Sequence, residues 1–276
     1  MNIQYFCPRW GSEDLSWDDF CRKVKAAGYD GIEAAIPFDD AEKATISQAL
    51  KENNLLLIGQ YYQSVEKDFT LHIANYEKHL YNIMSMQPLL IDAQTGKDYY
   101  SSEQNKMLFD TAEKLSAQTG IIVAHETHRN KALYAAHTAE KLLRENPLVK
   151  ITADFSHWCC VAESLLEDQP EALALASERA IHIHARVGYA EGPQVNDPRA
   201  SEWQSTLQIF MQWWDTIIYI RKEQGAALMT ITPEFGPAPY MPALPHSQIP
   251  VASQWDINVF MMNILKQRYQ AIASQL

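Results

Sequence analysis

Residues 180–186, AIHIHAR, form a short apolar segment in which two histidines and an arginine occupy alternate positions. Side chains alternate between the two faces of a β-strand, so His182, His184 and Arg186 are expected on one face. Ile181 and Ile183 are expected on the other face, against helices. An apolar strand of this length is typical of a parallel sheet covered on both sides. The segment therefore predicts a buried strand with one polar face.

Seven other segments are short, rich in Ile, Val or Leu, and typical of buried strands. With the first segment included, the predicted strands are 2–6, 31–36, 55–60, 88–93, 120–126, 149–155, 180–186 and 228–235.

Segments with helical periodicity separate these strands. Residues 16–27 carry apolar side chains at helical spacing, with a capping-box pattern at Ser16 and Asp19 and a stop signal at Gly28. Other clear helices follow Asp68 and Ser101 or span residues 201–223 and 254–275.

Eight predicted strands alternate with eight helices, mostly at a spacing of about 30 residues, which is the pattern of parallel βα units. We therefore predict the α/β class and a single (β/α)8 TIM barrel over residues 1–276. An open doubly wound sheet would usually carry a glycine-rich phosphate turn after its first strand, and YFCPRWGSED (5–14) has no GxGxxG.

The composition narrows the class of protein. The chain has 276 residues, 47% hydrophobic and 21% charged, as in globular proteins. With 23 basic and 34 acidic residues, its net charge of −11 argues against nucleic acid as a partner. No apolar run approaches the ~20 residues of a membrane span, and we expect no membrane partner.

The first residues show no signal-peptide pattern, so we expect a cytoplasmic protein. Its four cysteines show no CxxC spacing and are too few for a secreted disulfide scaffold, so we expect reduced thiols at Cys7, Cys21, Cys159 and Cys160.

Polar residues close four consecutive predicted strands, at the end where TIM barrels carry their functional sites. These residues are Glu126, Asp154, His184 and Glu234, and all four fall on the face that looks into the barrel. Each alone would commonly be a helix cap or an ion-pair partner. Together, at matched positions on neighbouring strands, they indicate a site.

Three carboxylates and a histidine at one point repel one another unless a cation or protons intervene. A single divalent metal ion is the simplest solution. Oxygen ligands with one imidazole suit Mn²⁺, Mg²⁺ or Co²⁺, and Zn²⁺ is also compatible.

This set, with His157 three residues after Asp154, resembles that of the xylose isomerase-like TIM barrels. Among these, it is most similar to the sugar phosphate isomerases/epimerases and the ketose 3-epimerases. AAGYDGIEA (26–34) is also similar to that family. The resemblance implies one metal ion held by the four strand-end residues, with Glu126 and Glu234 also acting as acid and base. It further implies that His157 contacts the substrate.

The chemistry of the residues agrees with this resemblance. Removing a proton next to a carbonyl leaves an enediolate, whose charge a metal ion can stabilise. Two carboxylates that flank the sugar could return the proton to the opposite face or to the neighbouring carbon, giving epimerisation or isomerisation. We therefore expect a metal-dependent isomerase or epimerase with a sugar as its small-molecule substrate.

Three further residues are candidates for substrate binding, each with a structural alternative. Arg186 could hold a substrate oxygen or pair with a nearby acid. Glu33 could contact substrate or close the barrel interior. Trp10, like Phe38 and Trp158, could stack on a sugar or pack within a loop.

Weaker candidates at the barrel mouth are Gln60, Asp92 and Gln94, and His182 is expected one layer below His184. Four basic residues could lie at the mouth without forming a clear phosphate cradle: Arg129, Lys131, Arg186 and Arg199.

Of three other functions, one stays open and two are disfavoured by the residues. A dehydratase or lyase of the same superfamily would share the first chemical step. A sugar-binding barrel without catalysis would have no need of a paired acid and base. The endonuclease IV branch would require more histidines and a basic cleft, which this acidic chain lacks.

Two long loops, 187–203 and 236–255, follow strands of the functional face, and the second is rich in proline. Loops of this length are expected to form a substrate lid or a subunit contact, so a homodimer is a further expectation.

Overall fold

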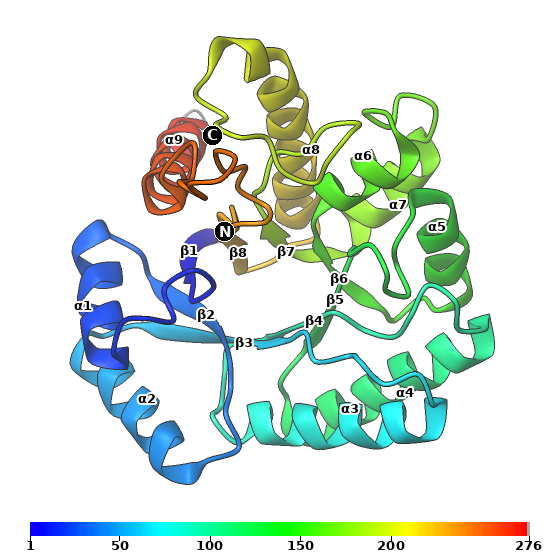
Figure 1. The fold of residues 1–276 in the computed structure, drawn as a ribbon. Helices are drawn as coiled ribbons and strands as arrows, with labels where there is room; N and C mark the ends of the chain where they lie inside the picture. The colour runs from blue at the N-terminus through cyan, green and yellow to red at the C-terminus, as the bar shows by residue number, and fades with distance from the viewer. Residues whose placement is uncertain (275–276) are drawn as a thin grey trace.

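The computed structural model describes residues 1–274 and contains a closed barrel of eight parallel strands (Figure 1). The strands follow one another around the barrel in chain order, and β8 pairs with β1 to close it. The predicted single-domain TIM barrel is confirmed. Its strands are β1 (Asn2–Pro8), β2 (Gly31–Ala35), β3 (Leu56–Tyr61), β4 (Ile91–Ala93), β5 (Val123–Glu126), β6 (Lys150–Ala153), β7 (Ala180–His184) and β8 (Leu228–Thr232).

Helices surround the barrel, and within residues 1–274 there are nine α-helices where eight were predicted. The additional helix is α6, which follows β6 directly. The helices are α1 (Trp17–Ala27), α2 (Asp40–Glu52), α3 (Phe69–Met84), α4 (Ser102–Thr119), α5 (Ala136–Glu145), α6 (Phe155–Ala162), α7 (Pro170–Arg179), α8 (Gln204–Glu223) and α9 (Gln254–Ser274). Residue 275, the predicted end of the last helix, lies outside the described residues.

Helix starts and stops follow the local sequence signals. The side chain of Ser16 accepts a hydrogen bond from the backbone of Asp19 at the start of α1, and Gly28 ends the helix in the left-handed conformation at φ 92°. Ser101 and Gln104 form both hydrogen bonds of a capping box at the start of α4.

Three strands are shorter than predicted at the functional face. β6, β7 and β8 end at Ala153, His184 and Thr232, so Asp154, Arg186 and Glu234 lie just beyond the sheet. Asp154 is instead the N-cap of α6, because its side chain accepts a hydrogen bond from the backbone of Ser156.

The register of the sheet shows which side chains face the barrel interior. Residues paired between neighbouring parallel strands share a face, and the pairs include Glu126 with Thr152, Thr152 with His182, and His184 with Thr232. The alternation predicted from the sequence is therefore confirmed for the polar residues of β5 and β7.

A small apolar cluster fills the barrel beneath these polar residues. It consists of Phe6, Ile58 and Leu90, and Ile181 packs against it. The prediction that Ile181 faces the helices is wrong: the pairing of β6 with β7 shifts between Ile151 and Thr152, and this irregularity accompanies the change of side. Ile183 does belong to the larger core between barrel and helices.

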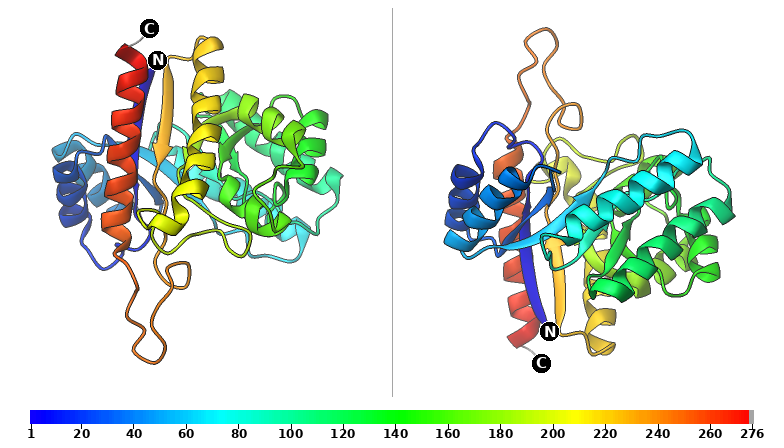
Figure 2. Two further views of the ribbon diagram at one scale, coloured as in Figure 1. Left: turned by 90° about the horizontal axis from the view of Figure 1, so that it is seen from above. Right: turned by 90° about the horizontal axis from the view of Figure 1, so that it is seen from below.

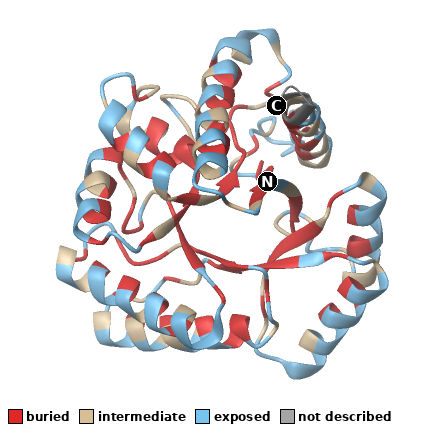
Figure 3. Ribbon diagram, turned by 180° about the vertical axis from the view of Figure 1, so that it is seen from behind, coloured by how far each residue is buried: buried red, intermediate tan, exposed pale blue. Residues whose placement is uncertain are grey.

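Burial follows the same division into layers. The strands are buried almost throughout, and most of the surrounding helices bury one face and expose the other (Figure 3). The exception is α6, whose first five residues are all buried. All four cysteines are free thiols, as expected. None of the described helices combines the length and hydropathy needed to cross a membrane.

The two long loops differ in shape. Residues 243–250 form a narrow hairpin, closed by a bridge between Ala243 and Pro250, that projects away from the barrel on the side opposite the termini (Figure 2). Gln194 of the other loop is buried and exchanges two hydrogen bonds with the backbone of Gly236. The subunit contact expected for these loops stays a prediction.

Phe6 is expected to be a major source of stability because its ring is fully buried in the floor of the barrel. Phe6→Ala should lower the free energy of unfolding by about 3–5 kcal/mol, measured from urea unfolding curves. Leu56→Ala is the control, since Leu56 is 40% exposed on β3. Equal losses in the two variants would show that the floor does not contribute as the packing indicates.

Candidate metal and substrate site

Four residues from consecutive strand ends meet at the mouth of the barrel. Glu126 ends β5, Asp154 follows β6, His184 ends β7 and Glu234 lies two residues beyond β8. All four are buried, and each offers a ligating atom within 4.8 Å of those of the others. The predicted set is therefore brought together in space.

The ring of His184 lies at the centre of this set. Its Nδ1 is 2.9 Å from Glu234 Oε2 and 3.4 Å from Glu126 Oε1, while its Nε2 is 3.0 Å from Glu33 Oε1. With a proton on Nε2 donated to Glu33, Nδ1 is left free to bind a cation. A carboxylate that orients a metal-binding histidine in this way is a common arrangement.

Glu33 lies beneath the four-residue set and not on the cavity surface. Its Oε2 accepts a hydrogen bond from Thr232 Oγ1 at 2.5 Å and lies 3.2 Å from His182 Nε2. Both carboxylate oxygens are thus engaged inside the barrel. The structure therefore gives Glu33 the second of its two expected roles, that of an interior residue, and places His182 below His184 as predicted.

The mouth of the barrel holds more buried carboxylates than buried bases. The carboxylates are those of Glu33, Asp92, Glu126, Asp154 and Glu234, and the bases are Arg186, His182 and His184. His157 is also buried there, but burial and the neighbouring His128 and Arg186 lower its pKa well below the usual value, so it adds no positive charge. Even with His182 and His184 both protonated, the carboxylates outnumber the positive charges by two. Buried charges require a partner, so a divalent cation would restore the balance.

Unpartnered buried atoms mark where such a cation would fit. Both carboxylate oxygens of Glu126 and the Nδ1 of His184 are buried without a hydrogen-bond partner among the described residues. Buried polar atoms in proteins are usually paired, and the unpartnered atoms here also include both carboxylate oxygens of Asp92. The set therefore fits a single metal ion with oxygen and imidazole ligands.

Two other groups of potential ligands are less suitable. In the group Glu33, His182 and His184, the carboxylate already bridges the two rings. The remaining group consists of Glu126, His128 and His157, which offers one carboxylate where the four-residue set offers three.

The electrostatic environment shifts the pKa values of the site in opposite directions. Burial would raise the pKa of Glu126, but His128, His184 and Arg186 lower it to about 2. At Asp154, burial raises the pKa more than the positive charge of Arg186 lowers it, and the pKa is about 6. Burial and the neighbouring Glu126 raise the pKa of Asp92 well above its usual value.

Arg186 lies inside the site and is only 1% exposed. Its guanidinium contacts Asp154 Oδ2, donates to the Glu234 carbonyl at 3.3 Å and lies 3.5 Å from Glu234 Oε2. The ion-pair alternative is therefore present, although Arg186 also lines the cavity, so its expected contact with substrate stays a prediction.

His157 is fully buried beside Arg186 and its Nε2 accepts a hydrogen bond from the guanidinium at 2.7 Å. Its ring packs against that of His128, with 3.8 Å between centroids and an angle of 47° between the ring planes. Burial, with the adjacent His128 and Arg186, lowers the pKa of His157 well below its usual value, so the ring is a neutral acceptor. The expected contact with substrate stays a prediction.

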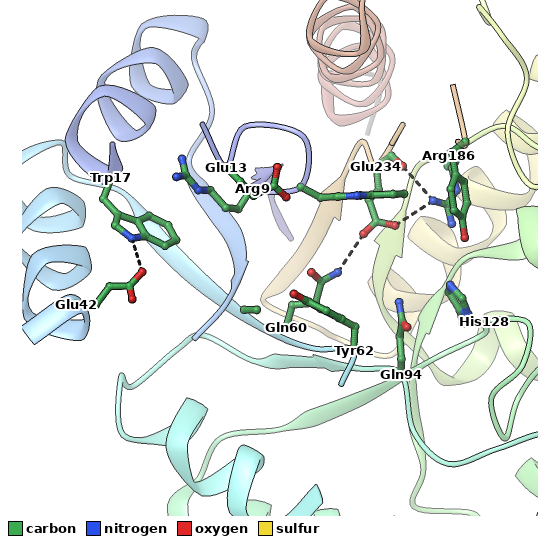
Figure 4. A pocket seen from close by; sticks show the side chains of 13 residues that line it. Arg9, Glu13, Trp17, Glu42, Gln60, Tyr62, Gln94, His128, Arg186 and Glu234 are labelled. Atoms are coloured by element: carbon green, nitrogen blue, oxygen red, sulfur yellow. Dashed lines mark hydrogen bonds and ion pairs between the residues drawn. The ribbon is translucent and has the colours of Figure 1, made fainter. Parts of the chain in front are cut away.

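A cavity of about 620 Å³ opens above the four-residue set (Figure 4). Its lining includes Trp10 and the weaker candidates Gln60 and Gln94. Gln60 Nε2 donates to Glu234 Oε1 at 3.1 Å. The ring of Trp10 packs edge-on against that of Tyr240, with 5.0 Å between centroids. The backbone carbonyl of Trp10 accepts a hydrogen bond from Gln254 Nε2 at 2.8 Å.

Other predicted candidates lie elsewhere. Trp158 is buried and donates to the Leu133 carbonyl, so it packs within the core. Phe38 is 46% exposed and packs on His79 outside the cavity. Asp92 is buried below the cavity floor.

Several residues of the cavity wall are not among those predicted from the sequence. His128 follows Glu126 by two positions and could have been found from the same alternation. The others carry no such signal, because they come from loops or from the first turns of helices: Arg9, Glu13, Trp17, Glu42, Tyr62 and Tyr240.

Comparison with known proteins supports the fold. No family model and no curated protein matches the sequence. A D-tagatose 3-epimerase-like protein of known structure has a TM-score of 0.66 at 10% identity, with 99% of each chain covered. A 3-keto-D-glucoside 4-epimerase from E. coli has a TM-score of 0.59 at 14% identity and covers 96% of this chain and 100% of its own.

A third structure, a "probable 3-DHS dehydratase" from Bacillus anthracis, has a TM-score of 0.58 at 18% identity and covers 96% of this chain and 99% of its own. At these identities the comparisons show the fold alone. The chain thus shares the barrel of xylose isomerase-like proteins, and its own residues must carry the argument about function.

Metal binding is expected to stabilise the protein. At a Mn²⁺ concentration about 100 times Kd, the gain is about 2.7 kcal/mol, or a rise of about 5 °C in Tm. Thermal unfolding with Mn²⁺ or with EDTA measures this difference. Glu126→Gln should abolish it, whereas Glu103→Gln, an exposed residue of α4, should retain it. The same rise in both variants would exclude Glu126 as a ligand.

Glu33 is expected to tune metal affinity without binding the metal. Glu33→Gln removes the charge that holds the Nε2–H of His184, and should weaken Mn²⁺ binding by roughly 10- to 100-fold. Isothermal titration calorimetry, with circular dichroism as the check on folding, measures the change. A folded variant with wild-type affinity would show that Glu33 does not act through His184.

Proposed function

We propose that this protein is a metal-dependent isomerase or epimerase of a keto-sugar. One observation carries the proposal: two carboxylates, Glu126 and Glu234, approach the same nitrogen of His184 at the floor of a cavity. They come from strands three positions apart around the barrel, which suits an acid and a base acting on one substrate. The same fold occurs in a 3-keto-D-glucoside 4-epimerase and in a D-tagatose 3-epimerase-like protein, which is compatible with this reaction class.

The metal would be held by Glu126, Asp154, His184 and Glu234. When bound, it would supply electrophilic stabilisation of the negative charge that develops on the substrate oxygens. Mn²⁺, Mg²⁺ or Co²⁺ suits this set of donors, and a xylose isomerase-like barrel from Mycobacterium smegmatis has been crystallised with magnesium.

Glu234 is the candidate base because its carboxylate opens onto the cavity. Gln60 and Arg186 fix that carboxylate from two sides, so its orientation does not depend on substrate. It would remove the proton from the carbon next to the carbonyl. To give an epimer, Glu126, which its low pKa keeps ionised, would first take up a proton from solvent and then donate it to the other face of the carbon. To give an isomer, Glu234 would return the proton that it removed to the neighbouring carbon.

Arg186 and His157 would act on the substrate side of the same site. The guanidinium lines the cavity beside Glu234 and is a fixed positive charge for an oxygen that becomes anionic. His157, neutral and hydrogen-bonded to Arg186, would keep the guanidinium in place. Substrate contact by either residue requires that part of this network open.

A dehydratase is the second candidate function. It would use the same proton removal and differ in the departure of a leaving group, and one structure of the same fold is described as a dehydratase. Product analysis separates the two reactions, because only the dehydratase releases water from its substrate. A sugar-binding barrel without catalysis would show no proton exchange.

Solvent-deuterium uptake into a panel of ketoses and keto-glycosides tests the proposal. Wild-type protein loaded with Mn²⁺ should incorporate deuterium, and Glu234→Gln should lower the rate by about 10²- to 10⁴-fold. Glu103→Gln is the matched control on the surface. Wild-type protein that binds Mn²⁺ but exchanges no substrate proton across the panel would contradict the proposal.

A further inference from the structure

The cavity continues well beyond the four-residue set. At the end away from Glu234 and Arg186 it is lined by Arg9, Glu13, Trp17 and Glu42, which we call the distal arm (Figure 4). Trp17 is the first residue of α1, and Glu42 lies in the first turn of α2. Because helices begin at the functional face of a TIM barrel, both side chains lie beside the mouth.

The cavity volume exceeds the needs of one sugar ring. A hexose displaces roughly six water molecules, on the order of 180 Å³ at about 30 Å³ per water. The cavity of about 620 Å³ is roughly three times larger. A monosaccharide held at Glu234 would leave the distal arm filled with water.

The side chains of the distal arm are arranged for an uncharged polar ring. The indole Nε1 of Trp17 donates to Glu42 Oε1 at 3.2 Å, which sets an aromatic surface beside a carboxylate. The guanidinium of Arg9 packs over Trp17 at 4.4 Å and over Phe20 at 4.6 Å. Aromatic faces contact the C–H groups of sugars, and carboxylates accept hydrogen bonds from their hydroxyl groups.

Arg9 also has donor capacity to spare. Its Nη2 donates to the Leu15 carbonyl at 2.5 Å, while its Nη1 is buried without a partner among the described residues. Because this atom is closed off from the cavity, it would meet a ring hydroxyl only if the Arg9 side chain moved on binding.

The charges around the cavity disfavour a phosphate. The lining contains two arginines, and Arg186 is already paired with Asp154 and Glu234. In the distal arm, Glu13 and Glu42 outnumber Arg9. An anionic group there would meet a net negative charge.

The other basic residues considered at the mouth are occupied. Arg129 packs on Tyr240, the amine of Lys131 donates to Ser64, and Arg199 pairs with Asp197. None of the three lines the cavity.

We propose that the substrate is an uncharged keto-sugar joined to a second uncharged sugar ring, and that the distal arm binds this second ring. The inference rests on the proposed function for the chemistry at Glu234. It adds a substrate class, a neutral keto-disaccharide in place of a free or phosphorylated ketose.

Matched substrates test the inference. Deuterium uptake is compared for D-fructose, for maltulose, which carries a glucose ring on the same fructose unit, and for D-fructose 6-phosphate. Methyl 3-keto-β-D-glucoside and 3-keto-cellobiose form a second pair. We expect kcat/KM to be at least about tenfold higher for the disaccharide of the pair that reacts, a difference of about 1.4 kcal/mol. Equal values, or a preference for the phosphate, would overturn the inference.

Variants of the distal arm locate the effect. Trp17→Ala should reduce the ratio of kcat/KM for disaccharide over monosaccharide by about tenfold, and Phe38→Ala, an exposed aromatic residue outside the cavity, should leave the ratio unchanged. Since Trp17 also packs on Phe20, Glu42→Ala is a second variant on an exposed side chain. An unchanged ratio in both folded variants would place the second ring elsewhere.

Binding separates this inference from the proposed function. Calorimetric titration of the unsubstituted protein with each disaccharide and its monosaccharide needs no turnover. The disaccharide could bind more tightly than its monosaccharide, and Trp17→Ala could abolish that difference, while no substrate takes up deuterium. That outcome would support binding of a second ring in the distal arm and would overturn the proposed isomerase or epimerase activity. Equal binding within both pairs would overturn the distal arm.

Discussion

The concentration of buried carboxylates at the barrel mouth is the constraint on which the rest of the site depends. Five of them surround a space that Arg186 and two histidines only partly neutralise. Isolated charges of this kind are too costly to bury, so each must gain a partner or a proton. Asp92, whose pKa is raised, keeps a proton, whereas Glu126, whose pKa is lowered, stays ionised beside His128, His184 and Arg186.

The fold meets this constraint with a connected network. Glu33 orients His184 from below, Gln60 and Arg186 orient Glu234 from the sides, and Ser156 fixes Asp154 through its backbone and side chain. Three of the four candidate ligands are thus held before any metal or substrate arrives, whereas the carboxylate of Glu126 has no hydrogen-bond partner among the described residues. Such preorganisation favours both metal affinity and stabilisation of charge during reaction.

The fold could be predicted from sequence because eight apolar runs and their helices repeat one simple pattern. The inward set of Glu126 and His184 could be predicted because alternation along a strand is local. Two features could not be predicted, because they depend on how neighbouring strands pair. One is the irregular pairing of β6 with β7, which turns Ile181 into the barrel, and the other is the end of β6 before Asp154, which makes Asp154 a helix cap. The distal arm could not be foreseen, since Trp17 and Glu42 meet only after two βα units have packed.

The central claim is that one divalent cation is held by Glu126, Asp154, His184 and Glu234. The most direct measurement is anomalous diffraction near the manganese absorption edge from crystals grown with Mn²⁺. We expect a single strong peak among the side chains of these four residues, next to the Nδ1 of His184. A peak between Glu33 and His182, or no peak at the four-residue set under saturating Mn²⁺, would contradict the claim.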